Sequence, residues 1–307
     1  MVLPSSQPRL TLASVPLSAE CAWSLIRAIR GRVGTELGNV GVALDDAGEL
    51  VVTSVDEGLV ALDPDTESGW VPARATVERD AATLLDLYIP LCTGPRAATM
   101  TVGHLAQSLD GRVATVDGAS QFISGQADLE HTHRLRALFD AVVVGACTVE
   151  LDDPRLTTRL VEGPSPTRVV LDGRGRLGAD RRVFTDDGAP TVVVVSRGAR
   201  PVDRGPNVDV VEVDLEEGWM PIRGVVDALA ERGLRRLFIE GGGVTVSGFL
   251  RAKALDRLHV TVAPVLFGSG RPAIALPEIE SLDEAIQLRC RHVPLGPDIL
   301  FDCPLPR

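Results

Sequence analysis

From residue 100 onward, short apolar runs rich in β-branched residues alternate with stretches whose apolar residues recur at helical spacing. The apolar runs predict strands over 101–105, 141–144, 168–171, 191–195, 208–213, 236–239 and 258–266. The periodic stretches predict helices over 125–139, 221–231 and 244–254. Runs such as AVVV and TVVVV lack polar alternation, which is typical of parallel strands covered on both faces by crossover helices. This part of the chain is therefore expected to form an α/β fold with a mostly parallel sheet.

The first 95 residues have a different pattern and hold most of the net charge. They predict a helix over 18–30, short strands within 40–60, and a helix over 77–88 that Pro90 should end. They contain six arginines and no lysine against thirteen acids, so 6 − 13 = −7 of the total charge of −11 lies here. We expect residues 1–95 to form a small, acidic α+β extension.

The end of the chain is expected to close the second domain. Stretches 286–293 and 299–303 flank a Leu-Gly-Pro-Asp turn, which predicts an antiparallel hairpin. We therefore expect residues 96–307 to form a single α/β domain with a C-terminal antiparallel hairpin.

Composition and charge argue against several classes of protein. A net charge of −11 disfavours nucleic acid or an anionic membrane surface as a partner, since both require a cationic face. No apolar run reaches the roughly 20 residues needed to span a bilayer, and the N-terminus lacks the order of a signal peptide, so we expect a cytoplasmic protein. The five cysteines show no C-x-x-C spacing and are expected to be reduced. The five histidines show no metal-ligand spacing, and we expect no metal.

Two glycine-rich segments are candidates for a phosphate-binding loop. Residues 173–178, GRGRLG, follow a predicted strand, but no periodic helix begins at their last glycine, so we expect a surface connection there. Residues 240–243, EGGG, follow the strand over 236–239 and open a helix, whose free N–H groups suit a phosphate. Glu240 would lie at the carboxyl end of a parallel strand, where α/β sheets bind ligands. A tight turn with a solvated acid is the alternative.

A third polar segment follows the strand over 141–144. It has the sequence GACTVELDDPRLTTR and places a hydroxyl, two acids and an arginine in a predicted loop, namely Thr148, Asp152, Asp153 and Arg159. Such a loop beyond a strand end suits a polar or anionic ligand, although the Asp-Asp-Pro turn could be purely structural.

The helix over 125–139 presents an arginine beside its apolar stripe. Ser124 is a candidate N-cap for this helix. Arg136 lies next to the stripe formed by Leu135, Leu138 and Phe139. From there its guanidinium could reach a phosphate while its stem packs, or it could simply be solvated.

Together these segments resemble a known family. SLDGR with SQFIS, HRLRALFDAVVVGACTVELDDPRLTTR, IEGGG before a helix, and HVTVAPVLFGSG occur in this order between residues 99 and 303. They resemble the pyrimidine reductases of riboflavin biosynthesis, which have a dihydrofolate-reductase-like fold and often form the C-terminal half of a bifunctional deaminase-reductase. The resemblance implies an enzyme that uses NADPH to reduce 5-amino-6-(5-phosphoribosylamino)uracil to the ribitylamino product. The family commonly dimerises, so a homodimer is expected as well.

Position by position, the resemblance implies two sets of site residues. Cofactor contacts would fall on Gln107, Phe122, Thr148, Asp152, Ser196, Gly242, Gly243, Val244 and Thr245. Contacts to the phosphorylated substrate would fall on Ser120, Arg136, Leu156, Arg159 and Glu240. Arg197, beside Ser196, could reach a cofactor 2′-phosphate.

The proton for the reduction could come from Asp152, Glu240, His104 or solvent. His104 stands where the family often has a lysine, and Phe122 where it usually has a tryptophan. Residues 1–95 resemble no deaminase. Two alternatives to the riboflavin-pathway step therefore stay open, namely a reductase of the same fold with another heterocyclic substrate, and a non-catalytic nucleotide-binding module.

Overall fold

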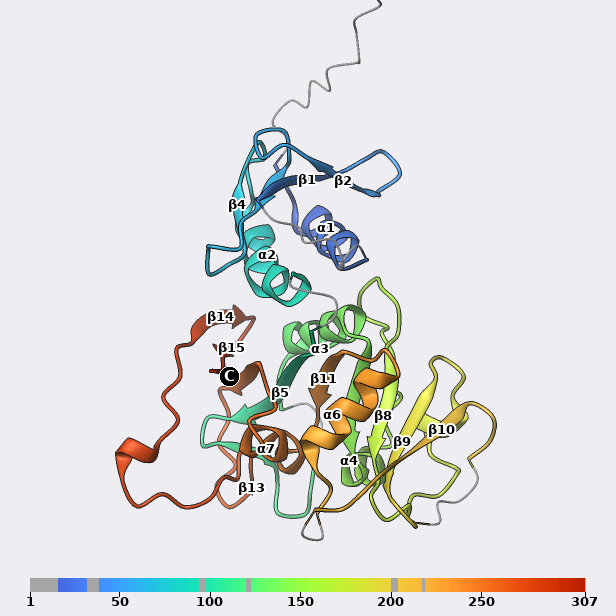
Figure 1. Ribbon diagram of the computed structural model, residues 1–307. Coiled ribbons are helices and arrows are strands. Elements are labelled where there is room, and N and C mark those ends of the chain that lie inside the picture. Colours follow the sequence, from blue (N-terminus) through green and yellow to red (C-terminus); the bar gives the residue numbers. More distant parts are fainter. Residues whose placement is uncertain are drawn as a thin grey trace, which may run out of the picture. The chain divides into compact units, whose positions relative to one another are not determined.

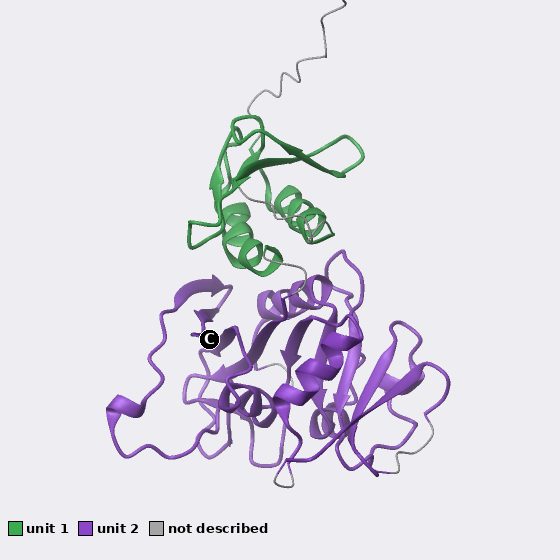
Figure 2. Cartoon of the chain, in the orientation of Figure 1, with its two compact units in different colours: residues 1–96 green, residues 97–307 purple. Residues whose placement is uncertain are grey.

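The computed structural model describes residues 16–31, 39–93, 98–119, 123–199, 204–216 and 219–306. Two candidate site residues, Ser120 and Phe122, lie outside the described residues. The chain forms two compact units, Met1–Arg96 and Ala97–Arg307 (Figure 2). The sequence predicted a domain boundary after residue 95.

The first unit combines two helices with a small antiparallel sheet. The helices are α1 (Ala19–Gly31) and α2 (Arg79–Cys92), and the strands are β1 (Val40–Leu44), β2 (Leu50–Thr53), β3 (Val60–Leu62) and β4 (Trp70–Pro72). In the described residues the strand order is β2-β1-β3-β4. Trp23 of α1 packs edge-on against Tyr88 of α2, with ring centroids 5.7 Å apart. This arrangement confirms the predicted α+β fold of the extension.

The second unit is built on one mixed sheet (Figure 1). Its strands are β5 (Met100–Ser108), β7 (Ala141–Gly145), β8 (Thr167–Leu171), β9 (Thr191–Ser196), β10 (Val208–Val213), β11 (Arg236–Glu240), β12 (Arg257–Ala263), β14 (Arg291–Leu295) and β15 (Asp298–Pro304). Among the described residues they follow the order β10-β9-β8-β7-β11-β5-β12-β15-β14. All neighbours from β10 to β12 pair in parallel, whereas β15 pairs antiparallel with both β12 and β14. The mostly parallel sheet and its C-terminal hairpin are as predicted.

Helices cover both faces of this sheet. They are α3 (Gln126–Leu138), α4 (Ala146–Asp152), α5 (Arg182–Thr185), α6 (Ile222–Glu231) and α7 (Gly243–Arg251), with short pieces β6 (Arg112–Ala114), β13 (Arg271–Pro272) and a 3₁₀ turn (Leu282–Glu284). Leu237 and Ile239 of β11 share a core with Val225 of α6 and Phe249 of α7. The intervening Phe238 faces the other way, against Phe139 at the end of α3. This alternation follows from the two-residue period of a strand and explains why the central strands are apolar throughout.

The hairpin is attached to the sheet by a buried charge network. Asp302 of β15 is fully buried and accepts hydrogen bonds from both Nε and Nη2 of Arg257, from Arg291 and from His259. Burial alone would raise the pKa of Asp302, but the bonds from His259 and Arg257 hold it well below its usual range. Asp302 is therefore an ionised carboxylate that joins β12, β14 and β15.

Several local expectations are corrected by the structure. Pro90 lies inside α2, which continues to Cys92, because the helix can lose one main-chain bond when its apolar face is buried. Residues 146–152 form the helix α4, so Thr148 and Asp152 are helical rather than in a loop. Cys290 and Cys303 form a disulfide, which contradicts the expectation of reduced cysteines, because the C-terminal hairpin folds the chain back and brings these two cysteines, 13 residues apart, together.

Membrane-spanning and metal-binding features are both absent from the described parts of the chain. No helix there is long and apolar enough to cross a membrane. In the same residues, no group of three or more His, Cys, Asp or Glu side chains lies close enough together to hold a metal ion.

Candidate active site

The candidate site residues gather at the carboxyl edge of the parallel sheet. Parallel strands end at the same edge, so residues that follow different strands meet there. Glu240 ends β11, Gln107 lies near the end of β5, and Ser196 ends β9. The helices α4 and α7 both begin at this edge, directly after β7 and close after β11. The edge therefore collects most of the sequence-predicted residues in the described parts of the chain.

The start of α7 is a close-packed glycine cradle. A Cβ atom on Gly243 would lie 2.8 Å from Pro272 O and still closer to Ala273 O, so no larger residue fits there. Gly241 has a φ of +128°, a backbone conformation that favours glycine. No side chain of the described residues hydrogen-bonds to the first turn of α7, whose N-cap is Gly242. The main-chain N–H groups of Thr245 and Val246 donate to Gly242 O, so those of Gly243 and Val244 are the ones that could face an anion such as a pyrophosphate.

Helix α4 lies beside this cradle. A Cβ on Gly241 would meet Thr148 Oγ1 at 3.2 Å, and one on Gly145 would meet Thr245 Oγ1 at 2.6 Å. The structure thus brings Thr148 and Thr245, which are about 100 residues apart in the chain, to the same glycine-lined surface. Val244, next to Thr245, is 83% exposed.

An arginine-rich pocket of about 330 Å³ lies next to α4. Its lining consists of Arg136, Asp152, Asp153, Pro154, Arg155, Leu156, Arg159 and Arg182. Four of these residues were predicted site residues, while Arg155 and Arg182 were not. Burial lowers the pKa of Arg159, and the nearby charges of Arg136 and Arg155 lower it further. Such crowding of cations suits an anionic group such as a phosphate.

The loop that carries this pocket has an unusual backbone. Asp153 has a φ of +40° and Leu156 a φ of +58°, although neither is a glycine. Left-handed conformations of such residues are costly and persist only where the surroundings hold them, often at functional sites. Here the Leu156 side chain is buried, and Asp153 Oδ1 accepts a 2.8 Å hydrogen bond from the main-chain N–H of Arg182.

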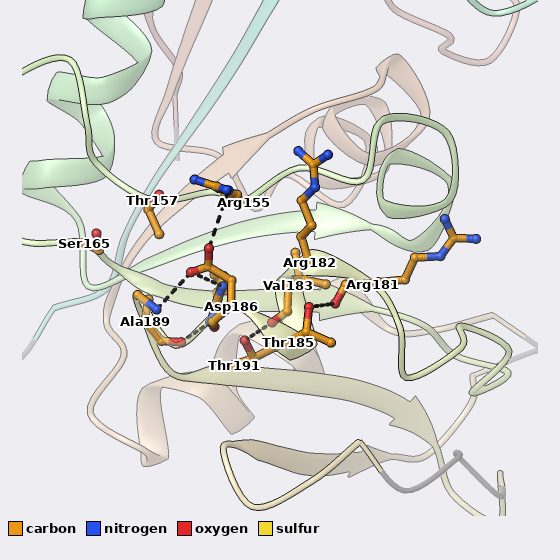
Figure 3. Close-up of polar contacts among 12 residues, drawn as sticks. Arg155, Thr157, Ser165, Arg181, Arg182, Val183, Thr185, Asp186, Ala189 and Thr191 are labelled. Carbon is orange, nitrogen blue, oxygen red and sulfur yellow. Dashed lines mark hydrogen bonds and ion pairs between the residues drawn. The ribbon is translucent and has the colours of Figure 1, made fainter.

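Asp186 supports the pocket from the core side. Its carboxylate lies 3.5 Å from Nε of Arg155 and 3.6 Å from Nη1 of the buried Arg168. In Figure 3 Arg155 reaches Asp186, whereas Arg181 points away from it. Asp186 therefore connects a pocket arginine to the packed interior.

Arg136 and Glu240 form a bidentate ion pair at the pocket. Nε of Arg136 donates to Glu240 Oε2 at 2.8 Å and Nη2 donates to Oε1 at 2.5 Å, while Nη1 donates to Thr157 O at 3.0 Å. The side chains are 8% and 18% exposed. Arg136 therefore fixes the orientation of Glu240 in addition to lining the pocket.

His133 is a further residue of this site that the sequence analysis did not select. Its Nδ1 accepts hydrogen bonds from the main-chain N–H of Arg159 at 2.8 Å and of Leu160 at 3.2 Å. Burial, Arg136 and Arg159 lower the pKa of His133 to about 4, so the ring is neutral near pH 7. His133 and Arg136 are three residues apart and share a face of α3, but no sequence signal indicates that His133 holds the loop of Arg159.

Two other candidates have specific surroundings. His104 of β5 is buried and bonded to Asp128 and Thr261. Ser124 is not the cap of α3, because the N-cap is Gly125, and its hydroxyl donates to Asp128 instead.

The segment 173–178 begins no helix, in agreement with the predicted surface connection. Main-chain N–H groups of Arg176 and Leu177 bond the carboxylate of Asp172, and the next helix, α5, begins only at Arg182. Arg197, the candidate for a cofactor 2′-phosphate, forms an exposed pair with Asp214, with Nε and Oδ1 2.5 Å apart.

A parallel sheet with a glycine-lined helix start next to a cationic pocket is typical of α/β enzymes that bind a nucleotide cofactor beside an anionic substrate. Residues 101–301 match the model of a protein family described as "RibD C-terminal domain". Because this match spans more than half of the chain, the chain belongs to the RibD C-terminal domain family. The resemblance inferred from the sequence segments is therefore confirmed.

Individual relatives agree with this assignment. The chain is 37% identical over 209 residues to the 2,5-diamino-6-ribosylamino-4(3H)-pyrimidinone 5′-phosphate reductase of Methanothermobacter thermautotrophicus, covering 65% of this chain and 94% of the relative. It is 30% identical over 267 residues to the riboflavin biosynthesis protein RibD of Bacillus amyloliquefaciens, covering 85% of this chain and 70% of the relative.

A solved structure shows the same fold. The crystal structure of a diaminohydroxyphosphoribosylaminopyrimidine deaminase/5-amino-6-(5-phosphoribosylamino)uracil reductase from Thermotoga maritima matches with a TM-score of 0.59 and 25% identity. The match covers 77% of this chain and 64% of that one, so this chain spans less than two thirds of the neighbour's length. The likeness confirms the predicted fold class, a mostly parallel sheet of the pyrimidine-reductase type.

Proposed function

We propose that the chain is an NADPH-dependent reductase that converts 5-amino-6-(5-phosphoribosylamino)uracil to its ribitylamino product in riboflavin biosynthesis. The observation that supports this most directly is the arginine-lined pocket beside the glycine cradle of α7. The first offers a phosphate site and the second a pyrophosphate site, at one edge of one sheet. The names of the relatives supply the reaction class.

A reductase of this fold uses a nicotinamide cofactor, and we propose NADPH. When bound, the cofactor supplies the hydride. The main-chain N–H groups of Gly243 and Val244 would hold its pyrophosphate, with Thr245, Gly242, Thr148, Asp152, Gln107 and Ser196 as further contacts. The fit rests on the close approach that the glycines allow and on the start of α7, which no side chain caps.

The residues of the pocket would bind and orient the phosphorylated substrate. Arg159 would pair with the phosphate, with Leu156 beneath it. Glu240, held by Arg136, would accept hydrogen bonds from substrate hydroxyl or amide groups. The proton would come from Asp152, Glu240 or His104. Enclosing the reacting atoms between these groups excludes water and sets their distance, which is the protein's main contribution to a hydride transfer.

The decisive experiment measures turnover by the purified chain. Oxidation of NADPH is followed with 5-amino-6-(5-phosphoribosylamino)uracil, and in parallel with the diaminopyrimidinone phosphate that the archaeal relative's name specifies. Turnover of the uracil in preference to the other compound is expected. Preference for the diaminopyrimidinone would mean that this chain acts on the substrate that the archaeal relative's name specifies. Cofactor binding without turnover of either compound would favour another heterocyclic substrate or a non-catalytic binding module.

Gly243→Ala is expected to weaken NADPH binding by about tenfold, since overpacking of this kind costs about 1–3 kcal/mol. The added methyl cannot avoid the main-chain oxygens of Pro272 and Ala273, so the first turn of α7 must move. Gly248→Ala in the same helix is the control, because its Cβ would meet only Ile222 Cδ1, at 4.0 Å. Fluorescence titration with NADPH measures both affinities. Equal affinity of Gly243→Ala and the wild type would contradict the cradle assignment.

Arg159→Ala is expected to raise KM for the phosphorylated substrate by about 10- to 150-fold, which corresponds to the roughly 1.5–3 kcal/mol of a charged hydrogen bond. The affinity for NADPH should not change. Steady-state kinetics give both constants, and Arg232→Ala, at the exposed end of α6, is the control for the loss of one positive charge. An unchanged KM would show that the phosphate binds elsewhere.

We also propose that the protein is cytoplasmic and forms a homodimer. The segment between β12 and β14 exposes apolar side chains, among them Leu266, Ile279, Leu282 and Ile286. A second copy of the chain would cover these side chains, since exposed apolar side chains that gather on one segment often mark an interface. Sedimentation equilibrium of the full chain tests the proposal.

A further inference from the structure

A small group of buried polar side chains joins α3 to the sheet beneath the candidate site. His104 of β5 is 4% exposed, Asp128 of α3 is 2% exposed and Thr261 of β12 is fully buried. His104 Nε2 lies 3.1 Å from Asp128 Oδ1 and 3.3 Å from Thr261 Oγ1. Thr261 donates to Asp128 Oδ1 at 2.5 Å, and Ser124 donates to Asp128 Oδ2 at 2.6 Å. Asp128 therefore accepts hydrogen bonds from β5, from β12 and from the turn that precedes its own helix.

The carboxylate decides which nitrogen of His104 carries the hydrogen. Burial alone would raise the pKa of Asp128, but the charge and hydrogen bond of His104 and the bond from Ser124 lower it below its usual range. Asp128 is therefore ionised and can only accept hydrogen bonds. It follows that Nε2 of His104 is the donor, which leaves Nδ1 as the nitrogen able to exchange a proton.

The His104–Asp128 pair lies next to Glu240. His104 and Glu240 are register partners on the neighbouring parallel strands β5 and β11, so their side chains share the face covered by α3. The same helix holds Glu240 through Arg136. One helix thus orients two candidate proton-carrying groups, through side chains eight residues apart.

Two further histidines face His104. His131 of α3 lies with its ring centroid 5.2 Å from that of His104, and its Nε2 is 3.1 Å from Nδ1 of His259 on β12. Burial lowers the pKa of both His131 and His259, so both rings are neutral near pH 7. Among the described residues, the carboxylate in direct contact with His104 is that of Asp128.

We propose that Asp128 is a positioning residue of the reduction, which holds His104 with its hydrogen on Nε2 so that Nδ1 serves as the proton-exchanging nitrogen beside Glu240. This inference rests on the proposed function. Reduction of a ring-opened imine adds the cofactor's hydride to carbon and a proton to nitrogen. His104 gives up the proton at Nδ1 and regains one from solvent, so charge and atoms balance.

The first test replaces the carboxylate by its isosteric amide. Asp128→Asn, which can present an N–H to the ring, is expected to lower kcat by about 100-fold, within the range of general acid–base catalysis, and to change the pH dependence of kcat. KM for the phosphorylated substrate and the affinity for NADPH should stay within about twofold of the wild type. Glu130→Gln, the same exchange at the exposed side of α3, is the matched control. An unchanged kcat and pH profile, or a loss confined to KM, would overturn the proposal.

A second measurement needs neither turnover nor a stable variant at Asp128. Nitrogen-15 NMR of the histidine rings in the full wild-type chain reports which ring nitrogen is protonated, and His104→Gln assigns the signal. Hydrogen on Nε2 of His104 is expected, and hydrogen on Nδ1 alone would refute the inference even if the wild type turns over substrate. If the ring has the expected form but the wild type reduces no pyrimidine, the proposed function fails and the catalytic role of Asp128 fails with it.

Discussion

Arg136→Met is expected to lower kcat/KM for the phosphorylated pyrimidine by about 100- to 1000-fold, because two charged hydrogen bonds to Glu240, worth about 3–4 kcal/mol together, are lost. Methionine retains the apolar stem of Arg136 but leaves the Glu240 carboxylate unpaired and free to turn away from the pocket. The bond from Nη1 to Thr157 O is lost as well, so the loop of Arg159 loses one support. Steady-state kinetics of NADPH oxidation measure the effect.

Arg136→Lys distinguishes orientation from charge. A lysine keeps the positive charge but cannot match both oxygens of Glu240 with a planar fork, so only partial recovery is expected. Thermal unfolding of each variant shows whether the fold is retained. A Met variant that folds and retains kcat/KM within about threefold of the wild type would refute the role assigned to this pair.

Asp302→Ala is expected to destabilise the second unit by about 3–5 kcal/mol, the usual cost of removing one partner from a buried ion pair. The substitution leaves Arg257 and His259 without their buried acceptor at the junction of β12 and β15. Since typical domains are stable by only about 5–15 kcal/mol, this loss threatens folding at ordinary temperature. Urea unfolding followed by far-ultraviolet circular dichroism gives the free energy of unfolding.

Asp302→Asn provides a graded comparison. The amide retains the volume and one accepting oxygen but directs an N–H₂ group at other donors, so an intermediate loss is expected. Asp227→Ala, which removes an exposed carboxylate from α6, controls for the change in net charge. If Asp302→Ala were no less stable than Asp227→Ala, the network would have no structural importance.

The elements of the second unit were largely predictable because their physical signals are local. β10 has the predicted bounds, 208–213, and most other strands agree within a few residues, since unbroken β-branched runs have few alternatives to a buried strand. β4 escaped prediction because it is a three-residue strand within a polar, turn-rich stretch. Helix α4 was not predicted, because the Asp-Asp-Pro turn signal at its end favoured a loop over the whole segment 145–159.

The site was predictable only in part. Glycines after a strand and arginines after a strand are visible in a sequence, and the structure does bring Thr148 and Thr245 to one surface. That Arg136 is bound to Glu240, and that His133 accepts from the loop of Arg159, depends on side chains about 100 and 26 residues apart. The hydrophobic periodicity of a sequence does not show which distant side chains form hydrogen bonds with one another.

The sequence by itself determined the α/β class, the mostly parallel sheet, the acidic extension and the family, because hydrophobic period, turn residues and ordered motifs are properties of contiguous segments. Only the tertiary structure decided which polar groups meet. It buried His104 against Asp128, paired Cys290 with Cys303 and joined Asp302 to Arg257. The physical reason is that removing a polar or charged group from water is costly unless a partner is near, and the fold alone determines where that partner lies.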